Sequence, residues 1–395
     1  MNKAKKNLIT LLIAIASVLL ALMIAVTCVM YAFSSYMDKY LGRGTRVVTD
    51  TGEGLDGDYI NFKYNSKEEA LANAQAVTQE TAEEGIVLLK NEGDALPLSK
   101  SAKLTILGYY SWHNNMSGGE DPATTEGAVS IGKGLEEKFD TNEAVNSLYA
   151  SANGDFADPA ASLASASGTF DEYNTAVITI KRNSGEGNDQ VTDYGAAEYN
   201  RTGLSINNAE LRLIDFACKN FDQVIIVINA ANTMEIGFLQ EDDPNMNNGI
   251  YTDPYSKQTF DFSKIVGAYW AGCCGSQGGK AFANILCGEV NPSGHTPDIY
   301  ARYLRNDPTY VNFGSFKYEN SASLNSYANS SYFVEYEEDI YIGYRYHETA
   351  AAEAAKGNYD GYDYDTEVVY PFGYGLSYTT FSHEFDGEPT YDAET

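Results

Sequence analysis

The sequence predicts an α/β domain, with a mostly parallel sheet sandwiched between helices, preceded by one N-terminal transmembrane helix. Two observations predict this fold. Leu8–Phe33 is an uncharged run of Leu, Ile, Ala, Val and Met. From residue 103 onward, short runs rich in β-branched residues alternate with amphipathic segments. Such alternation is typical of parallel strands that are covered by helices on both faces.

The apolar run near the N-terminus is long enough to cross a bilayer, since at helical rise Leu8–Phe33 spans about 39 Å. Three lysines precede it: Lys3, Lys5 and Lys6. The positive-inside rule then places the N-terminus in the cytoplasm. The alternative, a cleaved signal peptide, has a shorter apolar region of about 7–15 residues, and Ala32-Phe33-Ser34 fits a cleavage site poorly. We expect residues 1–34 to form a cytoplasmic tip and uncleaved signal anchor, with the lipid bilayer as partner and the main domain extracellular.

The remaining elements follow in order. Residues 35–66 are polar and predict a spacer. The spacing of Ala70, Ala74, Val77 and Ala82 predicts a helix over Lys67–Leu89. Its last part, Ile86–Leu89, is a short apolar run of the kind found in strands. Four apolar runs predict buried strands: Leu104–Leu107, Ala176–Ile180, Val224–Ile228 and Ile265–Trp270. Two segments predict helices: Asn207–Asn220 and Gly278–Leu286. Two polar stretches, 140–172 and 239–262, predict surface excursions.

Composition excludes several classes of function. The 55 acidic residues outnumber the 26 basic ones, giving a net charge of −29, and nucleic-acid binding needs a basic face. The five cysteines and four histidines show no metal-ligand spacing, so we expect buried free thiols and no metal or cofactor. The 31 tyrosines suit polar, ring-shaped ligands, although ordinary sheet packing explains most of them equally well.

A glutamate flanked by glycines follows the second predicted strand. Glu186 lies between Gly185 and Gly187, and in folds of this kind ligands meet the loops at the carboxyl ends of the strands. A carboxyl group held there can donate a proton if its environment raises its pKa. The alternative is an ordinary solvated loop residue, and the local pattern does not decide between the two.

Four segments, in this order, resemble the second domain of glycoside hydrolase family 3, the β-glucosidase and β-xylosidase group. They are Glu84–Glu92 with Leu96-Pro97-Leu98, Arg182–Asp189, Trp270–Gly272 with Gly278-Gly279 and Gly288–Gly294, and Tyr341–Tyr346 with Tyr370–Phe381. The last of these, which includes Pro371-Phe372-Gly373-Tyr374-Gly375-Leu376-Ser377-Tyr378, is long and specific. Together they frame residues 67–381.

The resemblance implies an α/β sandwich domain over 67–381 that packs beside a barrel domain. In the family, the barrel supplies an aspartate nucleophile and most of the sugar contacts, and the sandwich supplies the acid/base glutamate. Glu186 matches that glutamate. Arg182 and Asp189 are expected to orient the loop or to bind substrate, with a local salt bridge as the alternative. The implied function is hydrolysis of O-glycosidic bonds by a retaining exo-β-glycosidase of the β-glucosidase type.

The chain also departs from the family pattern. It contains no Asp-Trp nucleophile motif and no Lys-His pair of the kind that the barrel uses. Some members carry the sandwich first, so we expect a barrel beyond Thr395, with 382–395 as the start of a truncated following segment. The chain alone is then expected to be inactive. The alternative function is a membrane-anchored, non-catalytic sugar-binding module or an inactive fragment.

Overall fold

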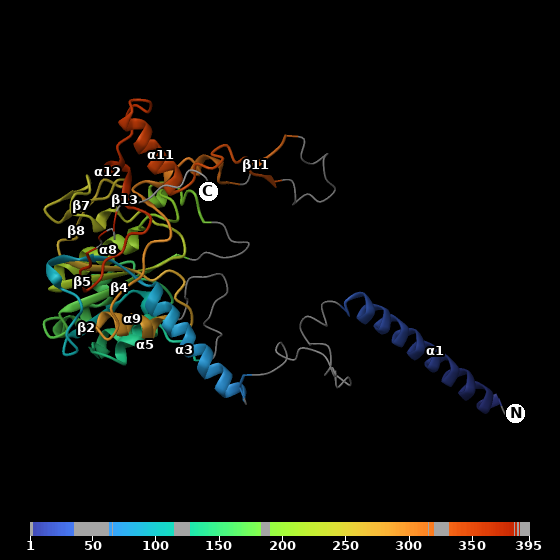
Figure 1. The fold of residues 1–395 in the computed structure, drawn as a ribbon. Helices are drawn as coiled ribbons and strands as arrows, with labels where there is room; N and C mark the ends of the chain where they lie inside the picture. The colour runs from blue at the N-terminus through green and yellow to red at the C-terminus, as the bar shows by residue number, and fades with distance from the viewer. Residues whose placement is uncertain are drawn as a thin grey trace. The chain divides into compact units, whose positions relative to one another are not determined.

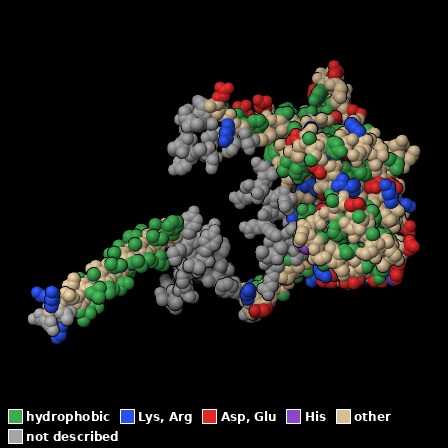
Figure 2. Space-filling view, turned by 180° about the vertical axis from the view of Figure 1, so that it is seen from behind, with side chains coloured by type: hydrophobic (Ala, Val, Ile, Leu, Met, Phe, Trp, Pro, Cys, Tyr) green, Lys and Arg blue, Asp and Glu red, His purple; other side chains and the backbone are tan. Residues whose placement is uncertain are grey.

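The computed structural model describes residues 3–34, 63–64, 66–113, 127–182, 190–314, 316–319, 332–382, 384 and 387. The chain divides into two compact units, Met1–Lys63 and Tyr64–Thr395. The smaller unit contains one long helix, α1 (Lys3–Ala32), whose apolar side chains are exposed along its length, as Figure 2 shows. Within the described residues, α1 alone is long and apolar enough to cross a membrane.

The larger unit is built on a six-stranded sheet with the strand order β1-β9-β5-β4-β2-β3. Figure 1 labels three of its neighbouring strands, β5, β4 and β2. Its strands are β1 (Val87–Asn91), β2 (Lys103–Leu107), β3 (Asp140–Thr141), β4 (Thr175–Lys181), β5 (Gln223–Asn229) and β9 (Ile265–Trp270). All neighbouring pairs are parallel except β1 with β9. The predicted α/β fold with a mostly parallel sheet is therefore confirmed for this unit, and the four predicted strands correspond to β2, β4, β5 and β9.

Helices cover both faces of the sheet. One face packs against α3 (Lys67–Gly85), α5 (Ile131–Glu136) and α9 (Gly278–Leu286), and the other against α6 (Glu143–Ala150) and α8 (Asn208–Asn220), while α7 (Pro159–Ser162) packs against α8. The central strand β5 shows why: Ile226 and Ile228 belong to the core on the α8 side, and Ile225 and Val227 to the core on the α9 side. A strand that is buried on both faces needs apolar residues at every position, which the run Val224–Ile228 supplies.

Two glycines let helices α5 and α9 approach closely. A Cβ atom on Gly279 would collide with the carbonyl group of Ser130, and one on Gly134 would collide with the carbonyl group of Gly279. Gly134 in α5 and Gly279 at the start of α9 are therefore required by packing between the two helices. The helix predicted over Lys67–Leu89 is four residues too long, because α3 ends at Gly85 and Ile86 leads directly into β1.

Both predicted surface excursions are wrong as descriptions of the structure. Within 140–172, Val145, Tyr149 and Phe170 are buried in the core beneath the sheet. Residues 239–262 contain a small antiparallel sheet, β6 (Met246–Asn247), β7 (Ile250–Thr252) and β8 (Thr259–Asp261). Helical spacing within 140–172 is confined to the short helix α6, and the strands within 239–262 are only two or three residues long, so neither segment shows a sustained period.

The C-terminal part of the unit returns to the sheet. The backbone N–H of Leu376 donates to the carbonyl oxygen of Leu88 at 2.9 Å, and the Tyr378 hydroxyl donates to the carbonyl oxygen of Ile285 at 2.9 Å. The long closing motif is therefore a strap across β1 and α9. The remaining short elements are α4 (Tyr109–Trp112), β10 (Tyr300–Ala301), β11 (Phe316–Lys317), β12 (Tyr332–Phe333), α11 (Tyr344–Ala355), α12 (Tyr364–Glu367), β13 (Val368–Tyr370), and the 3-10 turns η2 (Glu92–Asp94), η4 (Ala164–Thr169), η5 (Ala196–Glu198), η6 (Gly237–Leu239), η7 (Leu304–Asn306) and η8 (Tyr310–Asn312).

Candidate active site

The predicted acid/base segment follows the carboxyl end of β4, one of the central strands. Arg182 comes directly after β4, and Glu186 and Asp189 lie outside the described residues. The described chain resumes at Gln190, which lines a large pocket. The segment 183–189 therefore joins the end of a buried strand to a pocket wall, which is where an α/β fold carries its ligands.

Arg182 is buried and fully occupied by protein partners. Its guanidinium donates two hydrogen bonds to the carboxylate of Glu210, at 2.6 and 2.7 Å, and further ones to the carbonyl oxygens of Lys181, Gly203 and Ser205. Despite the opposing effect of burial, the neighbouring Glu210 charge keeps the pKa of Arg182 above its usual value. The Arg182 side chain thus holds the chain at the end of β4 to the segment 203–210.

Glu210 has a second role, at the start of α8. The side-chain oxygen of Asn207 accepts hydrogen bonds from the N–H groups of Ala209 and Glu210, both at 2.9 Å, and the Glu210 carboxylate accepts from the N–H of Asn207. This is a capping box, the arrangement that satisfies the free N–H groups of a first helical turn. One carboxylate therefore fixes both the helix start and the arginine that precedes the candidate loop.

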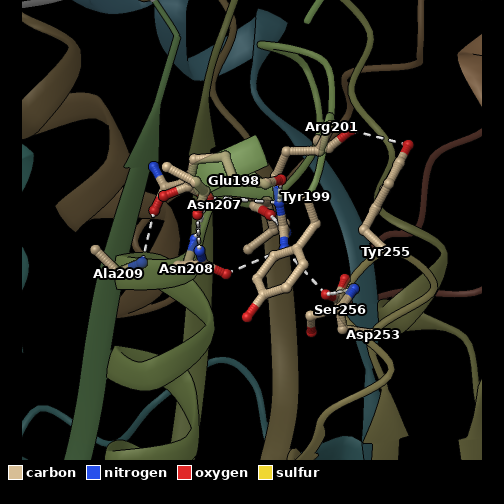
Figure 3. Close-up of polar contacts among 12 residues, drawn as sticks. Glu198, Tyr199, Arg201, Asn207, Asn208, Ala209, Asp253, Tyr255 and Ser256 are labelled. Atoms are coloured by element: carbon tan, nitrogen blue, oxygen red, sulfur yellow. Dashed lines mark hydrogen bonds and ion pairs between the residues drawn. The ribbon is translucent and has the colours of Figure 1, made fainter. Parts of the chain in front are cut away.

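A second buried arginine organises the same region (Figure 3). Arg201 donates to the Asp253 carboxylate at 2.9 Å and to the Asn208 side chain at 3.1 Å, and both Arg201 and Asp253 are almost inaccessible to solvent. Asp253 lies between β7 and β8, in one of the two segments that were expected to be surface excursions. The pair thus fastens the small antiparallel sheet to the start of α8.

A buried glutamate joins three further segments. Glu235 accepts hydrogen bonds from the Ser205 hydroxyl at 2.6 Å, from the Tyr255 hydroxyl at 2.5 Å and from the Leu304 N–H at 3.0 Å. Burial raises the pKa of Glu235, although these hydrogen bonds oppose the effect. Leu304 lines the large pocket, and so does Leu204, the residue before Ser205. Glu235 therefore holds two walls of this pocket together.

The pocket itself has a volume of about 810 Å³, within the range of about 300–1,000 Å³ that small-molecule sites occupy. Its wall mixes aromatic, aliphatic and polar side chains. They include Gln190, Thr192, Asn232, Asp298, Asp307, Tyr310, Phe313, Tyr336, Asp339, Ile342, Tyr344 and Arg345. This mixture of ring surfaces and hydrogen-bonding groups suits a polar ligand with an apolar face.

Asp307 is an ionised acceptor in that wall. Burial acts to raise its pKa, but the nearby His347 imidazole and the hydrogen bonds from Thr309 outweigh burial and lower it. The Thr309 hydroxyl donates to Asp307 Oδ1 at 2.6 Å. In the described part of the chain, no group of His, Cys, Asp and Glu side chains could hold a metal ion.

Comparisons with known proteins agree with this architecture. Residues 86–344 match the glycosyl hydrolase family 3 C-terminal domain. The chain belongs to glycosyl hydrolase family 3. Its sequence is 29% identical over 343 residues to beta-glucosidase A of Butyrivibrio fibrisolvens, and 27% identical over 331 residues to a beta-glucosidase of Ruminococcus albus. These alignments cover 78% of the chain in both cases, but only 36% and 28% of the two relatives.

Solved structures of the family show the same fold. Beta-glucosidase 3B from Thermotoga neapolitana, in complex with alpha-D-glucose, superposes with a TM-score of 0.59 at 25% identity, covering 84% of this chain and 42% of that one. A beta-glucosidase from Paenibacillus barengoltzii gives a TM-score of 0.58 at 25% identity, covering 81% and 31%. The α/β sandwich expected from the family 3 resemblance is therefore confirmed.

Sequence reasoning found Arg182 but missed most of the groups around it in this family 3 domain. Glu210 carries a visible signal, the Asn-x-x-Glu spacing of a capping box. Asp253, Glu235 and Asp307 carry none, since an acidic residue in a polar stretch reads as solvated surface.

Proposed function

We propose that this chain supplies the acid/base domain of a retaining exo-β-glycosidase of the β-glucosidase type, with Glu186 as the acid/base. The observation that carries the proposal is the Gly-Glu-Gly loop of a family 3 domain, which connects the end of β4 to the wall of an 810 Å³ pocket. In the first step Glu186 protonates the glycosidic oxygen. In the second it removes a proton from the attacking water.

In this proposal Arg182 and Asp189 orient the loop. The five hydrogen bonds of Arg182 to Lys181, Gly203, Ser205 and Glu210 support an orienting role for that residue, because they leave its guanidinium committed to the protein. A local salt bridge, Arg182 with Glu210, is part of the same arrangement.

Double displacement also needs a nucleophile about 5–5.5 Å from the acid/base. We propose that a barrel domain supplies it and seats against residues 311–344. Exposed apolar and aromatic side chains gather there: Val311, Phe313, Tyr336, Ile340, Ile342 and Tyr344. All of these except Val311 and Ile340 also line the large pocket. Tyr336 is 77% exposed, far more than a ring of that size usually is without a partner.

The first test measures the activity of this chain by itself. Residues 35–395, purified without the anchor, should not hydrolyse aryl β-glycosides, because one carboxylate cannot act as both nucleophile and acid/base. The same preparation joined to a family 3 barrel should be active. Turnover by residues 35–395 alone, lost on replacing an acidic residue of this chain, would contradict the division of the site. Sugar binding without turnover in the joined protein would favour the non-catalytic binding module instead.

We further propose that α1 spans the membrane as an uncleaved anchor. The hydroxyl groups of Thr10, Ser17 and Thr27 donate to the carbonyl oxygens four residues earlier, so none of these three needs water. The basic residues at its start favour a cytoplasmic N-terminus.

This topology predicts a specific result in intact cells. The protein should retain its N-terminus, sediment with membranes, and lose the part beyond residue 35 when protease is added outside. A tag on the N-terminus should be protected until the cells are lysed, which provides the internal control. A secreted form that begins near Ser34 would show a cleaved signal peptide instead.

A further inference from the structure

A second, smaller pocket lies where the start of α11 and the turn η7 meet residues 359–367. Its volume is about 330 Å³, at the lower end of the range of about 300–1,000 Å³ for small-molecule sites. It is lined by Asn306, Tyr346, His347, Tyr359, Asp360, Gly361, Tyr362 and Glu367. It shares no lining residue with the large pocket, although Leu304 and Tyr344 of that pocket lie on the same two segments.

Three tyrosines form one side of this pocket. The rings of Tyr359 and Tyr362 stack with their centroids 5.6 Å apart, and Tyr346 meets Tyr362 edge-on at 6.2 Å. The hydroxyls of Tyr346 and Tyr359 share a hydrogen bond of 3.0 Å. Burial raises the pKa of both Tyr346 and Tyr362, so these hydroxyls keep their protons and can donate. The surface thus combines ring faces with hydrogen-bond donors.

Carboxylates supply acceptors around the same pocket. Among the described residues, Asp360 has no hydrogen-bond or ion-pair partner. Glu367 uses Oε2 to accept from the Asn306 side chain at 3.0 Å, which leaves Oε1 for a ligand. Carboxylate oxygens accept strong hydrogen bonds from hydroxyl groups and repel anions. The ligand that fits is therefore neutral and rich in hydroxyl groups.

A buried histidine fixes the geometry of the tyrosine wall. His347 is only 1% exposed, and its Nδ1 lies 2.9 Å from the Tyr362 hydroxyl. Its Nε2 makes no hydrogen bond and faces Asp307 Oδ2 at 3.9 Å. Since Asp307 lines the large pocket, the imidazole stands between the two pockets. A single side chain therefore contacts groups of both sites.

We propose that this pocket binds one ring of a neutral pyranose sugar, with the ring packed on the tyrosines and its hydroxyls donating to Asp360 and Glu367. Its place beside the large pocket makes it an anchoring site for a second part of an oligosaccharide chain. The choice of a sugar over another neutral polyol rests on the proposed glycosidase function. The presence of the pocket and of its carboxylate acceptors does not depend on the proposed function.

The test measures binding to the full chain in lipid nanodiscs, prepared without sugar-based detergent. Methyl β-D-glucopyranoside and cellobiose are titrated and followed by saturation-transfer NMR and calorimetry. Tyr359→Ala should weaken the binding component of this pocket about tenfold, through loss of one ring face. Tyr341→Ala is the matched control, since Tyr341 is 45% exposed against 41% for Tyr359 and lines neither pocket. Tyr310→Ala, in the large pocket, should leave this component unchanged.

A second variant keeps the proposal testable if Tyr359→Ala fails to fold. Asp360→Asn removes charge from an exposed turn and should weaken sugar binding several-fold. Equal losses in Tyr359→Ala and Tyr341→Ala, or no loss in Asp360→Asn, would overturn the proposal. So would binding of Ca²⁺ with no binding of either sugar. Since the measurement involves no hydrolysis, its failure leaves the proposed function standing, and failure of that function leaves this result intact.

Discussion

Replacing Glu186 by Ala, in the chain joined to a nucleophile-bearing barrel, should slow hydrolysis of a β-glycoside with a poor leaving group by about 10²–10⁴-fold. The variant lacks the proton donor of the first step and the base of the second. A dinitrophenyl glycoside needs little protonation, so its first step should remain fast. Its glycosyl-enzyme intermediate should then accumulate, because water is no longer activated. Pre-steady-state kinetics would show this as a burst followed by slow turnover.

Added azide separates a catalytic role of Glu186 from a structural one. Azide needs no base and fits the space that the carboxylate leaves, so it should restore turnover and yield a glycosyl azide of retained configuration. The control is Glu92→Ala, which removes another glutamate that precedes a glycine in the sequence and should change neither rate. If Glu186→Ala slows both substrates equally and azide has no effect, Glu186 is a structural loop residue and the acid/base lies elsewhere.

The sheet was predictable because its strands are buried on both faces. Val224–Ile228 contains no polar residue, and β5 sends alternate members of this run into the two halves of the core. Helix α9 coincides with its predicted range for a related reason, since its apolar face and Gly279 both serve packing. Segments with sparse anchors were not predictable. Phe170 is surrounded in the sequence by small or polar residues, so no period reveals it, and the helical spacing of Val145, Leu148 and Tyr149 is confined to the short helix α6.

The candidate site was predictable only where it coincides with a motif. Arg182 was found because it opens a segment that resembles family 3, and Glu186 and Asp189 stay predictions from the same segment. Glu210, Asp253 and Glu235 escaped because a buried carboxylate needs a partner from a distant part of the chain. Their partners are 28, 52 and 30 residues away. The Asn-x-x-Glu spacing marks only the helix-cap role of Glu210, and nothing in the local sequence distinguishes Asp253 or Glu235 from the many solvated acids of this acidic protein.

Glu210→Ala should lower the free energy of unfolding by about 3–5 kcal/mol, the usual cost of leaving one member of a buried ion pair without its partner. The carboxylate receives two hydrogen bonds from Arg182 and one from the N–H of Asn207, so the variant loses an ion pair and a helix cap together. Domains are stable by only about 5–15 kcal/mol, so this is a large fraction. Urea unfolding of residues 35–395 should show a lower midpoint with an unchanged slope.

The matched control is Glu143→Ala, at the exposed first turn of α6, which should change stability by no more than about 0.5 kcal/mol. A double-mutant cycle then isolates the pair itself. Because Arg182→Met with Glu210→Leu leaves no unpaired charge, the double variant should cost less than the sum of the two single variants. Additive losses would show that the two side chains act independently.

The same cycle tests whether the pair positions the candidate loop. Arg182 directly precedes segment 183–189, and its ion pair with Glu210 attaches it to the start of α8. Glu210 also caps that helix start. If the pair orients Glu186, the double variant should remain folded yet lose kcat in the barrel-joined enzyme. The loss should be greatest on poor leaving groups, where proton donation limits the rate. Equal losses on good and poor leaving groups would instead indicate a general disturbance of the domain, and the orienting role of Arg182 would fail.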